Sequence, residues 1–154
     1  MAGSGEAPAA DLDAAERVGR ALAERGAVVV CGGLGGTMEA ACRGAKSAGG
    51  TTVGILPGHD RAEANPYVDV AIPTGLGEAR NALVVRAADA LIAVGGAWGT
   101  LSEIALALRA GKRVVGLATW ELSKGGEPVE GIVAADDPER AVELALEGRP
   151  DERH

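Results

Sequence analysis

The chain has 154 residues, which is enough for one domain with a sizeable core. Hydrophobic residues make up 47% of it, yet it contains no Phe, one Tyr and two Trp, so the core must be built from Ala, Val, Leu and Ile. A net charge of −7 argues against duplex nucleic acid or an anionic membrane as the main partner, because binding to a phosphate backbone needs a basic surface. A local anion site made of backbone amides stays compatible with this charge.

Helical and strand patterns alternate along the chain. Residues 1–10 are small and polar, and we expect a loose N-terminal segment there, then a single domain at 11–148 and a tail at 149–154. Apolar spacing and β-branched runs, bounded by glycine and proline, predict the elements. In chain order they are helix 11–25, strand 27–31, helix 37–48, strands 52–56 and 68–72, helix 78–88, strand 90–94, helix 101–110, strand 113–117, edge strand 132–134 and helix 138–146, with polar loops at 58–67 and 121–131.

This alternation predicts an α/β fold, a Rossmann-like doubly wound parallel sheet with helices on both faces. One feature departs from that pattern at the start of the chain. Only Met1 and Ala2 precede Gly3-Ser4-Gly5, where a first strand is expected. Either the first strand is missing or truncated, or Met1 is an internal start.

The two cysteines do not suggest a metal site. Cys31 and Cys42 form no C-x-x-C pair and no cluster with His59 or His154, so we expect no zinc. Cys31 is best interpreted as a buried core residue. Two cysteines without a signal peptide are typical of a reducing cytoplasm, and no apolar run reaches the length of a membrane span.

The glycine turn after strand 90–94 is the strongest candidate for a binding site. The sequence Gly95-Gly96-Ala97-Trp98-Gly99-Thr100 joins a buried strand to a helix. This geometry presents several backbone N–H groups to an anion. We therefore predict that the amides from Gly96 to Thr100, with the Thr100 hydroxyl, bind a phosphate. The alternative is an ordinary strand-to-helix turn.

A second glycine loop follows strand 27–31 and contains Gly32, Gly33, Gly35 and Gly36. It does not match the G-x-G-x-x-G fingerprint, and no acidic residue ends the next strand, so the ribose-binding carboxylate of a dinucleotide site is missing. No G-K-[ST] sequence exists, which excludes a P-loop. Four glycines exceed what one turn requires, which favours ligand contact, while a tight turn is the alternative. Both loops follow strands at the same sheet edge, so we expect them to converge on one crevice.

Glu103 brings a carboxylate close to the phosphate loop. It could act on a bound ligand as an acid or base. The spacing Thr100-Leu101-Ser102-Glu103 also fits a capping box, in which Glu103 would only satisfy a backbone N–H. Both interpretations stay open at this stage.

Arg80, Asn81 and Trp98 are further candidates. Arg80 starts the helix after Gly75-Leu76-Gly77 at the same sheet edge, where a cation is unusual, and it could clamp a phosphate in bidentate fashion. Asn81 could donate to the same ligand, and Trp98 could stack on a flat ring. The alternatives are a solvated surface Arg80 and a Trp98 that only packs.

These motifs resemble the Lonely Guy (LOG) superfamily from residue 11 to about 146. That group includes cytokinin-activating phosphoribohydrolases, proteins mislabelled as lysine decarboxylases, and molybdenum-cofactor carrier proteins. The resemblance rests on three segments in order: Cys31-Gly32-Gly33-Leu34-Gly35-Gly36-Thr37-Met38-Glu39-Ala40, then Arg80-Asn81, then Gly95-Gly96-Ala97-Trp98-Gly99-Thr100-Leu101-Ser102-Glu103.

The hydrolase signature P-G-G-x-G-T-x-x-E implies roles for individual residues. It makes Arg80 and Glu103 the catalytic pair and places Gly96, Gly99 and Thr100 in the phosphate loop. This chain departs from it: Gly95 replaces the proline, Ala97 a glycine and Ser102 a first glutamate. Asn81 stands where the hydrolases usually have lysine. The short chain and these departures resemble the carrier-like branch more closely.

Two functions therefore follow from the resemblance. The first is binding of a phosphorylated, nucleotide-like ligand, such as the molybdenum cofactor, without a required cofactor. The second is hydrolysis of the N-glycosidic bond of a nucleoside 5′-monophosphate such as AMP, with Arg80 and Glu103 catalytic. A lysine decarboxylase is rejected because none of Lys46, Lys112 and Lys124 lies in a motif for a pyridoxal Schiff base. From the resemblance we also expect a homodimer or homotetramer, for which Ile104, Leu106 and Leu108 could supply an interface.

Overall fold

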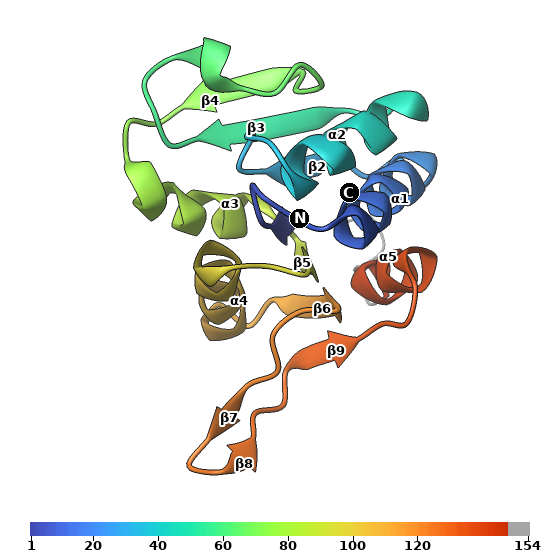
Figure 1. The fold of residues 1–154 in the computed structure, drawn as a ribbon, viewed down its shortest axis with the longest axis vertical. Helices are drawn as coiled ribbons and strands as arrows, with labels where there is room; N and C mark the ends of the chain where they lie inside the picture. The colour runs from blue at the N-terminus through green and yellow to red at the C-terminus, as the bar shows by residue number, and fades with distance from the viewer. Residues whose placement is uncertain (148–154) are drawn as a thin grey trace, which may run out of the picture.

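Parallel strands that lie between two layers of helices form the centre of the computed structural model, which describes residues 1–147 (Figure 1). One sheet has the strand order β1-β5-β6-β9 and another the order β2-β3-β4, all parallel. Their bounds are β1 (Ala2–Gly3), β2 (Val29–Cys31), β3 (Thr52–Leu56), β4 (Val70–Pro73), β5 (Ala90–Val94), β6 (Arg113–Leu117) and β9 (Ile132–Ala134). The predicted Rossmann-like α/β class is confirmed.

The first strand exists but is two residues long. Ala2 pairs with Ala93 and Gly3 with Val94 of β5, and the Met1 amino nitrogen donates to Val30 O at 2.8 Å. This contact joins the two sheets edge to edge. The prediction of a loose segment over residues 1–10 is therefore wrong for its first two residues. Met1 and Ala2 are buried at 6% and 1% exposure and contribute to the core.

The helices cover the two faces of the sheet. Helices α1 (Ala9–Glu24), α2 (Thr37–Ser47) and α5 (Pro138–Leu146) lie on one face, and α3 (Asn81–Ala87) and α4 (Trp98–Arg109) on the other (Figure 1). Alternation along β5 divides its side chains between the two layers. Ile92 and Val94 pack with α1 and α5, whereas Leu91 and Ala93 pack with α4.

Small residues allow α1 and α2 to approach closely. A Cβ on Gly19 would lie 1.9 Å from Ala41 O, and one on Gly44 would lie 1.9 Å from Glu16 O. A core without phenylalanine thus gains density by bringing backbones together rather than by filling space with rings.

Several element bounds differ from the sequence-based ones, and two differences matter for function. Helix α4 begins at Trp98 rather than near residue 101, and the predicted helix 78–88 divides into the 3₁₀ turn η2 (Gly77–Arg80) and α3. A second 3₁₀ turn, η1 (Arg61–Glu63), lies in the loop at 58–67. Arg80 therefore stands at the junction of two helical segments.

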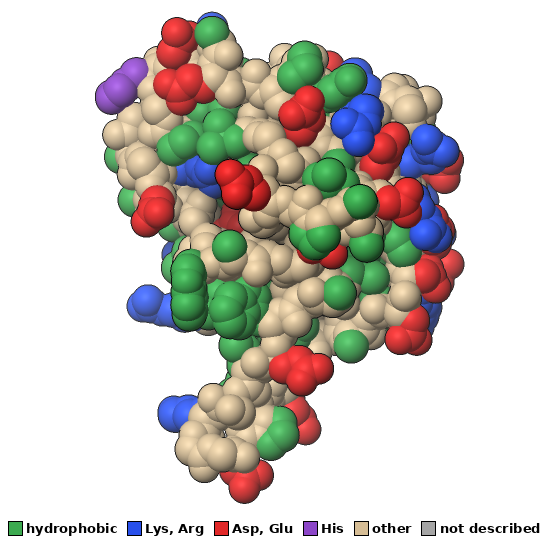
Figure 2. All heavy atoms as spheres, in the orientation of Figure 1, with side chains coloured by type: hydrophobic (Ala, Val, Ile, Leu, Met, Phe, Trp, Pro, Cys, Tyr) green, Lys and Arg blue, Asp and Glu red, His purple; other side chains and the backbone are tan. Residues whose placement is uncertain are grey.

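The predicted polar loop at 121–131 contains a hairpin. Strands β7 (Ser123–Lys124) and β8 (Glu127–Pro128) pair antiparallel and project away from the body of the domain (Figures 1 and 2). The turn between these strands contains Gly125 and Gly126, which both have positive φ. A tight hairpin turn requires such backbone angles. The tail predicted at 149–154 lies outside the described residues.

Within residues 1–147, no helix combines the length and the apolar character that crossing a membrane requires.

Candidate functional site

A pocket of about 300 Å³ opens at the carboxyl ends of the strands. It lies beside the boundary between β1 and β5, where the chain changes from one half of the sheet to the other, which is the usual ligand position in open α/β sheets. Its wall is formed by Met1, Ala2, Gly3, Ser4, Gly5, Leu34, Met38, Pro57, Glu78, Arg80, Asn81, Ala97, Gly99, Thr100 and Glu103.

The N-terminus of α4 forms one side of this pocket. Ala97 is its N-cap and offers no side-chain cap. The amides of Trp98, Gly99 and Thr100 fall in the first turn, where an α-helix supplies no acceptor for them. Gly95 (φ 54°) and Gly96 (φ 121°) take backbone angles that favour glycine, so the turn itself depends on these two residues.

Thr100 is buried at 2% exposure, and its Oγ1 has no hydrogen-bond partner in the described structure. Because Ala97 is the N-cap, Thr100 is the third helical residue and cannot be the capping half of a T-x-x-E box. The capping-box interpretation of Glu103 is therefore wrong. The physical reason is that the glycine turn ends three residues earlier than the apolar pattern indicated.

Glu103 lies in the pocket wall with 5% exposure. Burial raises the pKa of its carboxyl to about 7, although the Met1 ammonium and Arg80 act in the opposite direction. A carboxyl with this pKa exchanges a proton near neutral pH, so it can donate or accept a hydrogen bond toward a ligand.

Arg80 reaches the pocket from the end of η2 and is 8% exposed. Its Nη1 donates to Asn81 Oδ1 at 2.7 Å, while its Nε is buried without an acceptor in the described structure. Burial lowers the pKa of this guanidinium. The alternative interpretation, a solvated surface arginine, is thus excluded, and a buried cation faces the site.

Asn81 connects α3 to the start of α4 beside the pocket. Its Nδ2 donates to Ser102 Oγ at 3.0 Å, and Ser102 Oγ donates to Gly99 O at 2.8 Å. Arg80, Asn81 and Ser102 thus form a chain of hydrogen bonds that fixes the guanidinium relative to the start of α4. Asn81 lines the pocket, but its polar atoms are engaged within the protein.

The four glycines of the loop at 32–36 lie outside the pocket wall, which receives Leu34 from this segment. Most of them allow close packing instead. A Cβ on Gly32 would lie 2.6 Å from Arg80 Nη1, one on Gly33 2.7 Å from Leu56 Cδ2, and one on Gly36 2.3 Å from Ser4 O. A Cβ on Gly35 would make only ordinary van der Waals contacts, the nearest with Glu39 Oε2 at 3.9 Å.

Trp98, Gly95 and Gly96 also lie outside the wall. Trp98 is 76% exposed and pairs with Trp120 at a ring-centroid distance of 5.2 Å. Trp120 Nε1 donates to Ala97 O at 3.2 Å, which anchors the pair beside the turn. Figure 2 shows hydrophobic side chains gathered over α4 near the projecting hairpin.

The loop Gly3-Ser4-Gly5 was missed as a site element by the sequence analysis. Thr37 Oγ1 donates to Ser4 O at 3.0 Å, and a Cβ on Gly3 would lie 2.1 Å from Thr37 Oγ1. The sequence signal that could have indicated this loop is the pair of glycines, Gly3 and Gly5, at the end of a short strand. Asn65 was missed as well; its Nδ2 donates to Leu34 O at 2.9 Å and holds the neighbouring loop.

Cys31 and Cys42 are free, buried thiols whose sulfurs lie 3.6 Å apart. The hydrogen bond with Cys42 lowers the pKa of Cys31 to about 7, and the same contact raises the pKa of Cys42. No cluster of three or more metal-ligating side chains occurs among residues 1–147.

These features define a class: a Rossmann-like protein with a helix N-terminus that has no side-chain cap, a buried arginine and a buried carboxyl at the sheet switch point. The sequence pattern of the SLOG cluster 4 family matches residues 1–142, and the chain belongs to that family. This confirms the resemblance to the LOG and molybdenum-cofactor carrier superfamily.

Relatives of known structure or sequence cover most of the chain. An uncharacterized protein of Archaeoglobus fulgidus is 45% identical over 144 residues, which are 94% of this chain and 91% of that protein. The molybdenum cofactor binding protein of the phototrophic bacterium Rippkaea orientalis is 38% identical with a TM-score of 0.81, over 90% of this chain and 88% of that one. The molybdenum cofactor carrier protein MCP of Chlamydomonas reinhardtii is 34% identical with a TM-score of 0.78, over 94% of both chains.

Proposed function

We propose that this protein binds a phosphorylated pterin, the molybdenum cofactor, as a carrier. The observation that supports this most directly is the pair of buried donors, Arg80 Nε and Thr100 Oγ1, that lack acceptors within the described structure. A buried donor without an acceptor costs free energy. A phosphate group in the pocket would supply acceptors to both, together with the free first-turn amides of α4.

The rest of the wall suits an organic ring system next to that phosphate. Leu34, Met38 and Ala97 provide apolar surface, and the carboxyl of Glu103 provides one group that can donate or accept. The relatives that bind or carry the molybdenum cofactor have the same fold over nearly the whole chain. The cofactor is cargo here, and the protein contributes binding, orientation and exclusion of water.

The test is co-purification. The chain is expressed in a host that makes the molybdenum cofactor, and the purified protein is assayed for molybdenum by mass spectrometry and for pterin by fluorescence after oxidation. We expect both in the native chain and a loss of both in Arg80→Ala. Arg86→Ala, which changes an exposed arginine of α3, is the matched control. Absence of pterin from the native chain under these conditions would count against the carrier function.

Hydrolysis of nucleoside 5′-monophosphates is the second candidate, because the pKa of Glu103 is about 7 and its carboxyl shares the pocket with Arg80. Water would add to the ribose C1′ and the base would leave, which gives free base and ribose 5-phosphate. Incubation with AMP and other nucleoside monophosphates, followed by chromatography, tests this. Base release that is lost in Glu103→Gln would support an enzyme; co-purified pterin without base release would support the carrier alone.

A further inference from the structure

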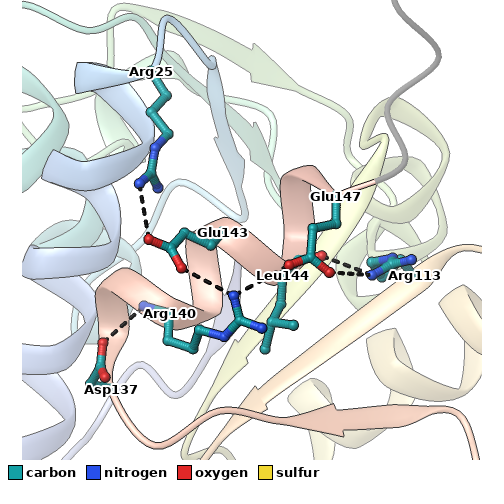
Figure 3. Close-up of polar contacts among 7 residues, drawn as sticks. All are labelled: Arg25, Arg113, Asp137, Arg140, Glu143, Leu144 and Glu147. Carbon is teal, nitrogen blue, oxygen red and sulfur yellow. Dashed lines mark hydrogen bonds and ion pairs between the residues drawn. The ribbon is translucent and has the colours of Figure 1, made fainter.

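Two groups of reactive or charged side chains lie outside the pocket, and the first is a set of ion pairs around α5. Arg25 Nη2 lies 3.5 Å from Glu143 Oε1, and Arg113 Nη1 lies 3.7 Å from Glu147 Oε2 (Figure 3). Arg140 Nη1 bridges the same two glutamates at 3.1 and 3.3 Å. The charges of this group are paired with one another, so it offers none of them to a ligand.

The second group is a pair of cysteines in contact inside the domain. Cys31 ends β2 and Cys42 lies on α2, and their sulfurs are 3.6 Å apart. Both residues are buried at 0% exposure. The S–S bond of a disulfide is about 2.05 Å long, so an approach of about 1.5 Å by the two sulfurs would join β2 to α2.

The surroundings of Cys31 favour its thiolate, which is the nucleophilic form of cysteine. The hydrogen bond with Cys42 is the main cause that lowers the pKa of Cys31 to about 7, and burial acts in the opposite direction. The Gly33 amide donates to Cys31 Sγ at 3.4 Å, and the charge of Arg80 also lowers this pKa. The same contact raises the pKa of Cys42. Near neutral pH, Cys31 can therefore ionise while Cys42 keeps its proton.

One layer of side chains separates this pair from the ligand pocket. Leu34 and Met38 pack with the cysteines and also line the pocket. Met38 is 8% exposed, and methionine is a flexible side chain that adapts to its surroundings. A small uncharged molecule in the pocket can therefore reach the sulfurs when Met38 moves, whereas a bulky disulfide reagent cannot.

We propose that Cys31 and Cys42 form a reversible disulfide when a small hydroperoxide reaches them through the pocket. The Cys31 thiolate attacks one peroxide oxygen, the O–O bond breaks, and the other oxygen leaves as an alcohol, or as water from hydrogen peroxide. The Cys42 sulfur then attacks the sulfenic acid on Cys31, so that the S–S bond forms, the S–O bond breaks and water leaves. The two thiols lose two electrons, the peroxide gains them, and the two thiol protons end on the two oxygen products.

The disulfide would enclose the whole glycine loop between β2 and α2. Residues 32–41 lie between the two cysteines, and this segment contributes Leu34 and Met38 to the pocket wall. Its first residue, Gly32, packs against Arg80, since a Cβ there would lie 2.6 Å from Nη1. Oxidation would therefore restrict the segment that shapes one side of the pocket.

The test uses the full chain, purified with a reductant that is then removed. After treatment with excess hydrogen peroxide, the protein is denatured in an alkylating agent and its intact mass is measured. We expect a loss of two hydrogens without alkylation of either cysteine, and alkylation of both after treatment with dithiothreitol. Hydrogen exchange at the Thr37 and Ala40 amides, which donate to Ser4 O and Gly36 O, should slow about tenfold on oxidation.

Two serine variants assign the roles of the thiols. In Cys42→Ser the nucleophile stays and the resolving thiol is lost, so peroxide should add one oxygen that dithiothreitol removes. In Cys31→Ser only Cys42 remains, and because burial still raises its pKa, no such oxygen should be gained. The route is tested by Met38→Ala, which thins the pocket wall and should oxidise several-fold faster than Met38→Leu.

Three results would overturn this inference. Alkylation of both cysteines in the peroxide-treated native chain would show that the pair stays reduced. An equal gain of oxygen by the two serine variants would remove the distinction between a nucleophilic and a resolving thiol. Equal rates for the two Met38 variants would place the entrance elsewhere. These assays contain no pterin, so their outcome does not depend on the carrier function.

Discussion

Thr100 shows how one side chain can be unfavourable for folding and favourable for binding. Its hydroxyl is buried without a partner, so Thr100→Val, which keeps the shape and removes the polar atom, should raise the free energy of unfolding by about 1 kcal/mol. The same change removes a donor to the ligand phosphate, so pterin affinity should fall about tenfold or more. Denaturant melts and pterin retention measure the two effects.

A matched substitution separates these effects from general disturbance of the helix. Thr37→Val removes a hydroxyl that is also buried but donates to Ser4 O at 3.0 Å, so it should lower stability. If Thr100→Val destabilised the protein to a similar extent, its hydroxyl would have a partner within the fold and the anion site would lose its main support.

Glu103 should make stability depend on pH. Its folded pKa of about 7 lies above the ordinary 4.5, so between these values the folded state holds a proton that the unfolded state has lost. The contribution of Glu103 to the free energy of unfolding is therefore greatest below pH 4.5. It decreases by about 3 kcal/mol in total as the pH rises to 7. Denaturant melts from pH 4 to 8 measure this, and Glu103→Gln should remove most of the fall.

Other groups near Glu103 also contribute to this profile. The Met1 ammonium, Arg80 and Cys31 act on its carboxyl, and Glu78 lines the same pocket. Glu78→Gln is the control, because Glu78 is exposed and its change should leave the slope in place. A native chain whose stability stays flat from pH 4.5 to 7 would show that Glu103 is ionised throughout.

At the scale of elements, the glycines of the α4 turn should respond differently to substitution. A Cβ on Gly99 has no close neighbour, the nearest atom being Asn81 Nδ2 at 4.0 Å, whereas one on Gly96 (φ 121°) would lie 2.6 Å from Thr100 Cβ. Gly99→Ala should therefore keep or raise stability by about 0.5 kcal/mol, and yet weaken ligand binding because Gly99 lines the pocket.

Gly96→Ala should instead lower stability by about 2 kcal/mol, because both the backbone angle and the Thr100 contact oppose a side chain. Thermal melts of the two variants, followed by the pterin assay, give the comparison. Equal melting temperatures for Gly96→Ala and Gly99→Ala would contradict the turn geometry.

The sequence allowed the parallel sheet and its alternating helices to be predicted, because continuous β-branched runs such as residues 90–94 and 113–117 leave little choice of environment. The position of Arg80 at the same edge followed from topology. The start of α4 could not be predicted in this way. Trp98 and Gly99 were interpreted as turn residues, although both adopt the helical conformation in the first turn of α4. The glycines at 32–36 misled for another reason: their surplus serves packing against Arg80, Leu56 and Ser4, which no local pattern reveals.

The whole molecule presents an apolar surface that the individual elements do not explain. Ile104, expected as an interface residue, is fully buried against the sheet. The most exposed large hydrophobic side chain is instead Trp98, at 76% exposure among the described residues, and it pairs with Trp120. Exposed apolar patches mark interaction sites, and aromatic residues are enriched at protein–protein interfaces.

We therefore predict that the protein forms a homodimer or homotetramer through the surface around Trp98 and Trp120. Light scattering coupled to size-exclusion chromatography should give a mass of two or four chains for the native protein. Trp98→Ser should shift the mass toward one chain, because truncation of an aromatic anchor at the centre of an interface costs about 2 kcal/mol or more. Val28→Ser, which changes a 52% exposed side chain at the opposite edge of the sheet, should leave the mass unchanged. A single-chain mass for the native protein at micromolar concentrations would instead make the tryptophan pair a surface of the monomer, beside the mouth of the pocket.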